Sequence, residues 1–195
     1  MTDPARRAHL LRAAERLLLR YGPAKTTIAE VAREANVAVG SVYLEFESKE
    51  ALVGELSTMK HRRVLDEVRA AVDAPGRPYA ERLRALFDAR TEALLAIVDE
   101  GLHACDLVHC ARDGVAEAKR RFEAELRALV VELLRAGAKA GELDAKRPEH
   151  VADALLRAYA TLAPPHLAST PRDDVAAALR ALHELTLYGL VRRKK

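Results

Sequence analysis

The sequence has no tryptophan, only three phenylalanines and five tyrosines, and only two cysteines in 195 residues. Valine and isoleucine together supply 18 residues, whereas alanine and leucine supply 67. Because β-branched and aromatic side chains favour strands while alanine and leucine favour helices, this composition argues against a β-sandwich, a β-barrel or a parallel α/β sheet. Two cysteines are also too few for a disulfide framework. The sequence therefore predicts an all-α protein.

Long hydrophobic runs and a large excess of one charge are also missing. The longest unbroken apolar run, Ala93 to Val98, has six residues, so we expect no membrane-spanning helix. The net charge is +3, but residues 192–195 alone carry +4, so bulk charge is no evidence for nucleic-acid binding. Charged residues interrupt any signal-peptide core near the N-terminus. We therefore expect a cytoplasmic protein that has no contact with membranes.

Apolar residues recur at helical spacing through most of the chain, and glycine and proline mark the breaks. Short helices give way to long ones near residue 47, which predicts one domain over residues 1–47 and a second over residues 48–195. Residues 102–114 form a less regular segment. The predicted helices cover residues 4–20, 28–34, 39–46, 49–74, 78–101, 115–140, 148–162 and 171–191.

Residues 27 to 46 have the layout of a helix-turn-helix motif, with two short helices joined by Ala35-Asn36-Val37. Thr27, with Glu30 three residues later, predicts a capping box at the start of the first helix. The second helix begins with the small residues Val39-Gly40-Ser41, which allow it to approach base edges in a major groove. Tyr43 lies outside the apolar stripe of that helix, where its hydroxyl can reach a phosphate. The motif therefore indicates DNA binding, although plain packing in a helical bundle would give the same spacing.

The same region resembles the TetR family of bacterial transcriptional regulators over roughly residues 9 to 56. The matching residues are Thr26-Thr27-Ile28-Ala29-Glu30-Val31-Ala32, Asn36 to Tyr43, Phe46, and Ser48-Lys49-Glu50-Ala51-Leu52. The resemblance implies an all-helical homodimer with an N-terminal three-helix domain that binds operator DNA. It also implies a larger C-terminal helical domain that binds a small-molecule effector and dimerises.

Carried over to this sequence, the resemblance implies that the helix from Val39 to Leu44 lies in the major groove. Val39, Gly40 and Ser41 would then face base edges, and Thr27, Tyr43 and Lys49 would hold the phosphate backbone. Three positions depart from the family. Ala38 stands where the family often has a capping serine, Val39 where a polar or basic residue is common, and Glu45 where histidine is usual. An acid at position 45 would repel the DNA backbone unless it turns away or pairs with a neighbour.

An effector pocket of this family lies inside the C-terminal helices. Residues that place aromatic, apolar and polar groups on those helices are therefore candidates for its lining, although ordinary core packing explains each of them as well. Arg90 would suit an anionic ligand if it is buried. The candidates are Phe87, Arg90, Leu94, His103, Cys110, Phe122 and Tyr159.

Five possible metal ligands lie within eight residues, at His103, Cys105, Asp106, His109 and Cys110. On one straight α-helix they would divide into a triad and a separate pair, so they could not all surround one ion. The two cysteines would also be too far apart for a disulfide. We therefore predict no metal or other cofactor here, with Cys110 as a small buried residue and the histidines as rim or pocket groups. Contact with the effector, and metal or thiol sensing, stay open as alternatives.

The last two long helices are rich in small residues, which permit close approach of helices. The family pairs these helices with their mates in a four-helix dimer interface, although intramolecular packing would use the same pattern. The candidate interface residues are Leu155, Ala158, Leu162, Leu179, Leu182, Thr186 and Gly189.

These observations predict a ligand-responsive transcriptional repressor that leaves its operator when a small-molecule effector binds. The alternative is a helical binding protein for a small molecule, metal or thiol signal that does not bind DNA in a sequence-specific way. An enzyme is not predicted, because the sequence has no G-x-S-x-G elbow, no P-loop and no dinucleotide fingerprint.

Overall fold

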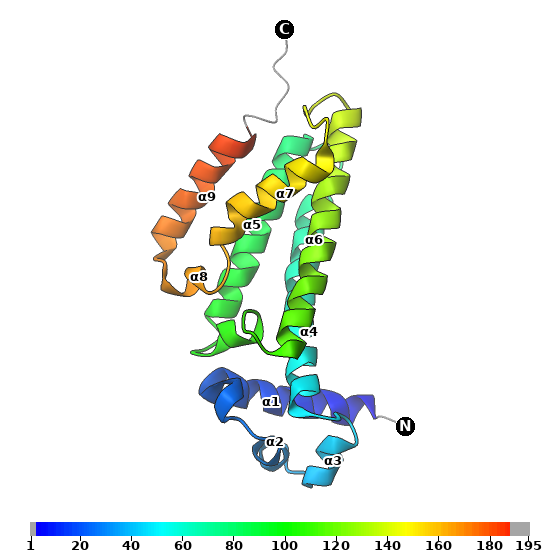
Figure 1. Ribbon diagram of the computed structural model, residues 1–195, viewed down its shortest axis with the longest axis vertical. Coiled ribbons are helices and arrows are strands. Elements are labelled where there is room, and N and C mark those ends of the chain that lie inside the picture. Colours follow the sequence, from blue (N-terminus) through cyan, green and yellow to red (C-terminus); the bar gives the residue numbers. More distant parts are fainter. Residues whose placement is uncertain (1–2, 188–195) are drawn as a thin grey trace. The chain divides into compact units, whose positions relative to one another are not determined.

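A computed structural model describes residues 3–187 of the chain (Figure 1). Throughout that range the regular elements are helices, which confirms the all-α prediction. They are α1 (Pro4–Lys25), α2 (Ile28–Glu34), α3 (Val39–Tyr43), α4 (Lys49–Val72), α5 (Tyr79–Val98), the 3-10 turn η1 (Ala104–Leu107), α6 (Asp113–Lys139), α7 (Pro148–Ala158), the 3-10 turn η2 (Tyr159–Thr161), α8 (His166–Ser169) and α9 (Arg172–Leu187).

The chain forms two compact units. Unit 1 contains Met1–His61 and Ala96–Arg120, and unit 2 contains Arg62–Leu95 and Arg121–Lys195. The proposed DNA-binding region, residues 1–47, falls wholly inside unit 1, which also takes in the first half of α4 and the segment around η1. A functional boundary at residue 47 stays a prediction.

In unit 1, local signals in the sequence set the ends of the first helices. The Asp3 carboxylate accepts the N–H of Ala5 at 3.0 Å and so caps α1. Gly22 has a φ of 80°, which interrupts helical geometry where a Tyr-Gly-Pro break is predicted, and one further turn then runs to Lys25. Asn36, with a φ of 54°, makes the turn between α2 and α3 in the left-handed region that asparagine tolerates.

The recognition-helix candidate α3 ends at Tyr43, three residues earlier than predicted. Ala38 gives its N-terminus no side-chain hydrogen bond, as expected from the missing serine. Val42 and Phe46 are buried against Ile28 and Val31 of α2 in one apolar cluster, so the short helix is held by its packing.

Unit 1 also contains a close approach between α4 and α6 at two glycines. A Cβ built on Gly114 would lie 2.7 Å from the carbonyl oxygen of Glu50 and 2.9 Å from the Cα of Gly54. Real Cβ atoms do not approach backbone atoms so closely. The two backbones can therefore meet here only because neither residue has a side chain.

Unit 2 is built from α5, α7, α8, α9, the second half of α4 and most of α6, around a separate apolar core. Its largest fully buried side chains include Tyr159, Phe87 and Leu134. The helix predicted over residues 148–162 instead ends at Ala158 and continues as the 3-10 turn η2. None of the helices within residues 3–187 is long and apolar enough to cross a membrane.

Candidate functional site

The second helix of the helix-turn-helix pair, α3, and its C-cap residue Leu44 present an apolar and aromatic surface. Val39 is 42% exposed, Tyr43 54% and Leu44 70%, which is unusual for side chains of this size. A Cβ added to Gly40 would meet no atom within 4 Å, so the backbone there is open to an approaching partner. Ser41 is half-buried beside them. The predicted base contacts Val39, Gly40 and Ser41, the predicted phosphate contact Tyr43, and Leu44 at the C-cap are therefore all at least partly accessible.

The two predicted phosphate contacts at helix starts have structural partners already. The Thr27 hydroxyl accepts the N–H of Glu30 at 3.2 Å, and the Glu30 carboxylate accepts the N–H of Thr27 at 2.8 Å, which confirms the predicted capping box. The Lys49 ammonium donates to the carbonyls of Pro23 and Thr26, at 3.0 and 3.2 Å. Lys49 therefore fixes the start of α4 to the end of α1, and a phosphate would have to share its ammonium.

Glu45, the unexpected acid next to the recognition helix, turns inward. Its carboxylate accepts hydrogen bonds from Nε and Nη2 of Arg6 at 2.8 and 2.7 Å, and its backbone carbonyl accepts one from Arg7. The bond from Arg6 lowers the pKa of Glu45, so the side chain stays ionised. Since the carboxylate is fully enclosed, it presents no negative group to a phosphate. The pairing that sequence reasoning asked for is therefore present.

In unit 2, a chain of polar side chains joins three helical elements. The Asp88 carboxylate of α5 accepts a hydrogen bond from Nε2 of His183, on α9, at 2.8 Å. The other ring nitrogen of His183 lies 2.8 Å from the Tyr159 hydroxyl, which is also 3.1 Å from the Thr186 hydroxyl. The Tyr159 ring stacks on Phe87, with 3.8 Å between ring centroids and 7° between planes. Burial raises the pKa of Tyr159, so its hydroxyl keeps its proton.

Arg90 is buried, with 7% of its surface exposed. Its Nη1 donates to the carbonyls of Tyr159 and Leu162, each at 3.3 Å, and its Nε is buried without a hydrogen-bond partner. Burial lowers the pKa of Arg90 to about 10, and the negative charge of Glu123 partly opposes that shift. The guanidinium is therefore still a cation at neutral pH.

The structure brings together only part of the predicted effector-pocket lining. Five of the seven candidates are buried in unit 2, namely Phe87, Arg90, Leu94, Phe122 and Tyr159. His103 and Cys110 lie in unit 1, where Cys110 packs against the apolar cluster of that unit. The His103 ring lies against Gly22 and is 3.0 Å from the Asp106 carboxylate. These two side chains are thus placed with the helix-turn-helix region.

The segment from His103 to Cys110 does not form the straight α-helix for which the division into a triad and a pair was predicted. Only Ala104–Leu107 is helical, as the 3-10 turn η1. Burial, together with the charge of Asp106, raises the pKa of Cys105 and so disfavours its thiolate. Across residues 3–187 no group of three or more histidine, cysteine, aspartate or glutamate residues is placed to hold a metal ion.

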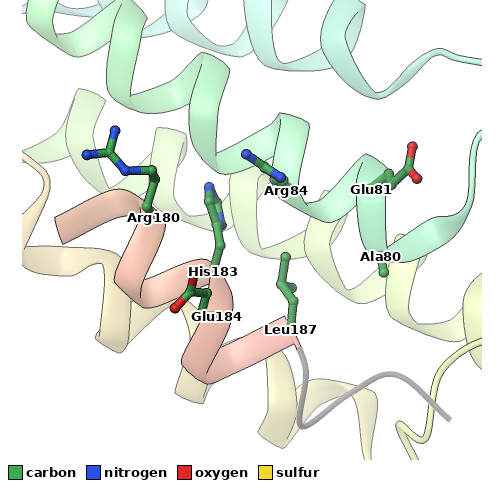
Figure 2. Close-up of a pocket in the computed structure, with 7 residues that line it drawn as sticks. All are labelled: Ala80, Glu81, Arg84, Arg180, His183, Glu184 and Leu187. Carbon is green, nitrogen blue, oxygen red and sulfur yellow. The ribbon is translucent and has the colours of Figure 1, made fainter. Parts of the chain in front are cut away.

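A cavity of about 420 Å³ lies between the start of α5 and the second half of α9 (Figure 2). His183 points from α9 toward α5, where Arg84 lies on the facing helix. None of the cavity residues was a sequence-based candidate, because single charged residues on two distant helices carry no signal of their own. The lining consists of Ala80, Glu81, Arg84, Arg180, His183, Glu184 and Leu187.

The candidate dimer residues fall into three groups. Leu155 and Leu162 are each 4% exposed and pack inside unit 2. Ala158, Leu179, Leu182 and Thr186 are half-buried, and Gly189 lies outside the described residues. Sequence reasoning missed Leu185, which is 78% exposed on α9 and is the kind of large apolar side chain that a partner would cover.

The all-helical fold and the α2–α3 pair define a helix-turn-helix protein. A family model for bacterial regulatory proteins of the tetR family matches residues 10–56. The chain is 29% identical over 157 residues to the HTH-type transcriptional regulator TtgR of Pseudomonas putida, a match that covers 72% of this chain and 71% of TtgR. Residues 10–56 therefore match the tetR-family model, and the chain as a whole is similar to bacterial regulators of that family.

Two further proteins extend this relationship. The chain is 36% identical over 90 residues to the HTH-type transcriptional repressor KstR2 of Mycobacterium tuberculosis, which covers 46% of this chain and 44% of KstR2. A bacterial regulatory protein in the tetR family from Rhodococcus RHA1 shares the fold with a TM-score of 0.67, at 22% identity, over 99% of this chain and all of that one.

Proposed function

We propose that this protein is a ligand-responsive repressor that binds operator DNA as a homodimer and leaves it when a small-molecule effector binds. The observation that carries the proposal is the exposed surface of α3 and its C-cap residue, where Val39, Tyr43 and Leu44 are 42%, 54% and 70% exposed. The curated relatives support repression, since one of them is a transcriptional repressor.

The chemistry of α3 favours apolar readout of bases. Val39 and Leu44 can contact a thymine methyl, Gly40 allows close backbone approach, and Ser41 can hydrogen-bond to a base edge or a phosphate. The Tyr43 hydroxyl and the helix starts at Thr27 and Lys49 supply phosphate contacts that orient the helix. Two recognition helices would read half-sites about one helical turn apart, roughly 34–36 Å.

We assign the dimer contact to the exposed faces of α7 and α9, centred on Leu185 together with the half-buried Ala158 and Leu182. A two-fold interface places each of these residues near its counterpart. Leu185→Lys should therefore convert dimer to monomer in analytical ultracentrifugation. A Leu102→Lys variant is the matched control, because Leu102 is 86% exposed but lies on neither helix.

The effector is assigned to unit 2, where Phe87, Leu94 and Tyr159 surround Arg90 along α5 and η2. Binding there would favour a conformation whose recognition helices no longer match the operator spacing. Release then follows from the different affinity of the effector for the two conformations.

The DNA-binding step is tested with Tyr43→Ala and a gel shift on DNA from upstream of the gene. The variant should bind about tenfold or more weakly than the wild type, as expected when one well-placed contact is lost. Tyr21→Ala is the matched control, since Tyr21 is 43% exposed but lies on α1. Affinity of the wild type should also fall steeply with salt.

Sequence-independent binding, or no binding, by the wild-type dimer would contradict the proposal. That result would favour a helical ligand-binding protein that does not read DNA. Equal loss of affinity in both tyrosine variants would instead show that α3 has no special role.

A further inference from the structure

Arg90 is a buried cation whose carboxylate-binding edge is unfilled. Nη1 donates to two carbonyl oxygens, and Nε is buried without a hydrogen-bond partner. Nη2 makes no hydrogen bond to a residue from 3 to 187 and, unlike Nε, is not fully buried. No ion pair to Arg90 is present in that same range, and Glu123 acts on it only as a more distant charge. Buried charges in proteins are normally paired, so the missing partner needs an explanation.

Other arginines in the chain show what this edge normally binds. Arg127 places Nε 2.6 Å from one Asp153 carboxylate oxygen and Nη2 3.3 Å from the other. Arg7 uses the same two nitrogens on the two oxygens of Glu55. This side-on fork matches the geometry of a carboxylate. In Arg90 the equivalent Nε–Nη2 edge has no such partner.

A purely structural role accounts for only part of this arrangement. The carbonyls of Tyr159 and Leu162 lie at the end of the α7–η2 helical segment, where a cation stabilises the unpaired carbonyls. That role uses Nη1 alone. It leaves Nε desolvated without a hydrogen bond, which is costly for a charged group.

The surroundings of Arg90 indicate what accompanies the acidic group. Phe87 and Leu94 lie about one turn to either side of Arg90 on α5, and both are buried and apolar. Tyr159 connects Arg90 to the cavity between α5 and α9, because its carbonyl accepts Nη1 while its hydroxyl bonds to His183 in the cavity wall. A molecule with one acidic group and an apolar body would match both the Arg90 guanidinium and the apolar side chains of Phe87 and Leu94.

We propose that Arg90 binds the carboxylate of the effector through its free Nε–Nη2 edge, and that the effector is therefore an apolar carboxylic acid. This inference rests on the proposed function in placing the effector in unit 2. A carboxylate on Arg90 would compete with the Tyr159 and Leu162 carbonyls for the guanidinium. Effector binding would thereby loosen the end of α7, one of the two helices assigned to the dimer.

The test measures whether the purified full-length protein prefers acids to alcohols. The probes are straight-chain carboxylates from butanoate to dodecanoate and 2-naphthoate, each compared by calorimetry at pH 7 with the alcohol of the same carbon skeleton. The wild type should bind at least one acid about tenfold or more tightly than its alcohol. Arg90→Met should lose that preference while keeping the affinity for the alcohol.

Two further variants make the result specific to the fork. Arg90→Lys keeps the charge but not the planar edge, so it should retain only a small part of the preference. Arg127→Met, which removes an arginine whose fork is already filled, should keep the full preference. If Arg90→Met does not fold by circular dichroism, the Arg90→Lys result decides.

Three results would overturn the inference. The wild type could bind acids and alcohols equally well throughout the series, it could bind no acid at all, or Arg90→Met or Arg90→Lys could keep the full preference for acids. The proposed function is judged separately by the gel shift. Release of operator DNA by a neutral alcohol, without acid preference, would contradict the anionic anchor alone. Acid binding at Arg90 by a protein that does not bind DNA would contradict the repressor and leave the anchor standing.

Discussion

Removing the Tyr159 hydroxyl should destabilise unit 2 by a measurable amount. Tyr159→Phe keeps the ring on Phe87 but deletes both hydroxyl contacts, to His183 at 2.8 Å and to Thr186 at 3.1 Å. A net hydrogen bond contributes about 1 kcal/mol, and buried partners left without one add to the cost, so the free energy of unfolding should fall by about 2 kcal/mol. For a chain of this size that corresponds to about 4–8 °C in Tm.

The assay is urea unfolding followed by circular dichroism, together with a thermal scan of the same samples at fixed protein concentration. Tyr21→Phe is the control, because Tyr21 is 43% exposed and loss of its hydroxyl should change the free energy of unfolding by less than about 0.5 kcal/mol. In a double-mutant cycle, Tyr159→Phe and Thr186→Val should cost less together than the sum of the single changes. A Tyr159→Phe protein as stable as the Tyr21→Phe control, or strictly additive costs, would show that the Tyr159 hydroxyl contacts do not stabilise unit 2.

Three further predictions concern unit 1. Thr27→Ala removes the cap of α2 and should cost about 1 kcal/mol in urea unfolding, whereas an unchanged midpoint would show that the capping box is not stabilising. The hydrogen bond from the Thr27 backbone lowers the pKa of Glu30 in the folded protein. The Glu30 carboxylate therefore stabilises the fold at any pH above the pKa of Glu30 in the unfolded chain, near 4.5. This stabilisation disappears as the pH falls through the lower pKa of the folded protein. Glu30→Gln should therefore be less stable than the wild type at pH 7, and the difference should close below pH 4.5; a constant difference would contradict this assignment. Gly114→Ala should lower the free energy of unfolding by about 1–3 kcal/mol, because the added methyl group would overpack against Glu50. Gly40→Ala is the control, since open space surrounds Gly40 and the change should leave stability unchanged or higher. Similar stabilities in the two variants would argue against the close approach of α4 and α6.

The features of unit 1 that could be predicted are those set by neighbours in the sequence. The Thr27–Glu30 capping box and the left-handed Asn36 depend on residues within three or four positions, and both are present. The match of residues 10–56 to the family model reflects the same local signals. The end of α3 at Tyr43 was not predictable, because its apolar stripe continues to Phe46, which packs without being helical.

The candidate ligand site in unit 2 depends on contacts far apart in the sequence. The hydrogen-bond partners of the buried Arg90 are the Tyr159 and Leu162 carbonyls, 69 and 72 residues away, so the residue pattern of α5 alone does not distinguish it from an exposed arginine. The Asp88–His183 contact spans 95 residues. For His103 and Cys110 the local sequence was misleading. These residues belong to a cluster of possible ligands close together in the sequence, but they lie in unit 1, whereas the other candidate pocket residues lie in unit 2.

The glycine pair in unit 1 bears on how a signal could reach the recognition helix. With no side chain between Gly54 and Gly114, the start of α6 rests directly on the first turns of α4 and cannot slide along them independently. An ion pair between Arg112 and Glu50 adds a second attachment one turn away. Only the five residues from Leu44 to Ser48 separate α4 from α3. A rotation of the first turn of α6 would therefore be transmitted as a tilt of α4 at its N-terminal end, and the short connection would carry the tilt into α3, the helix proposed to read the operator.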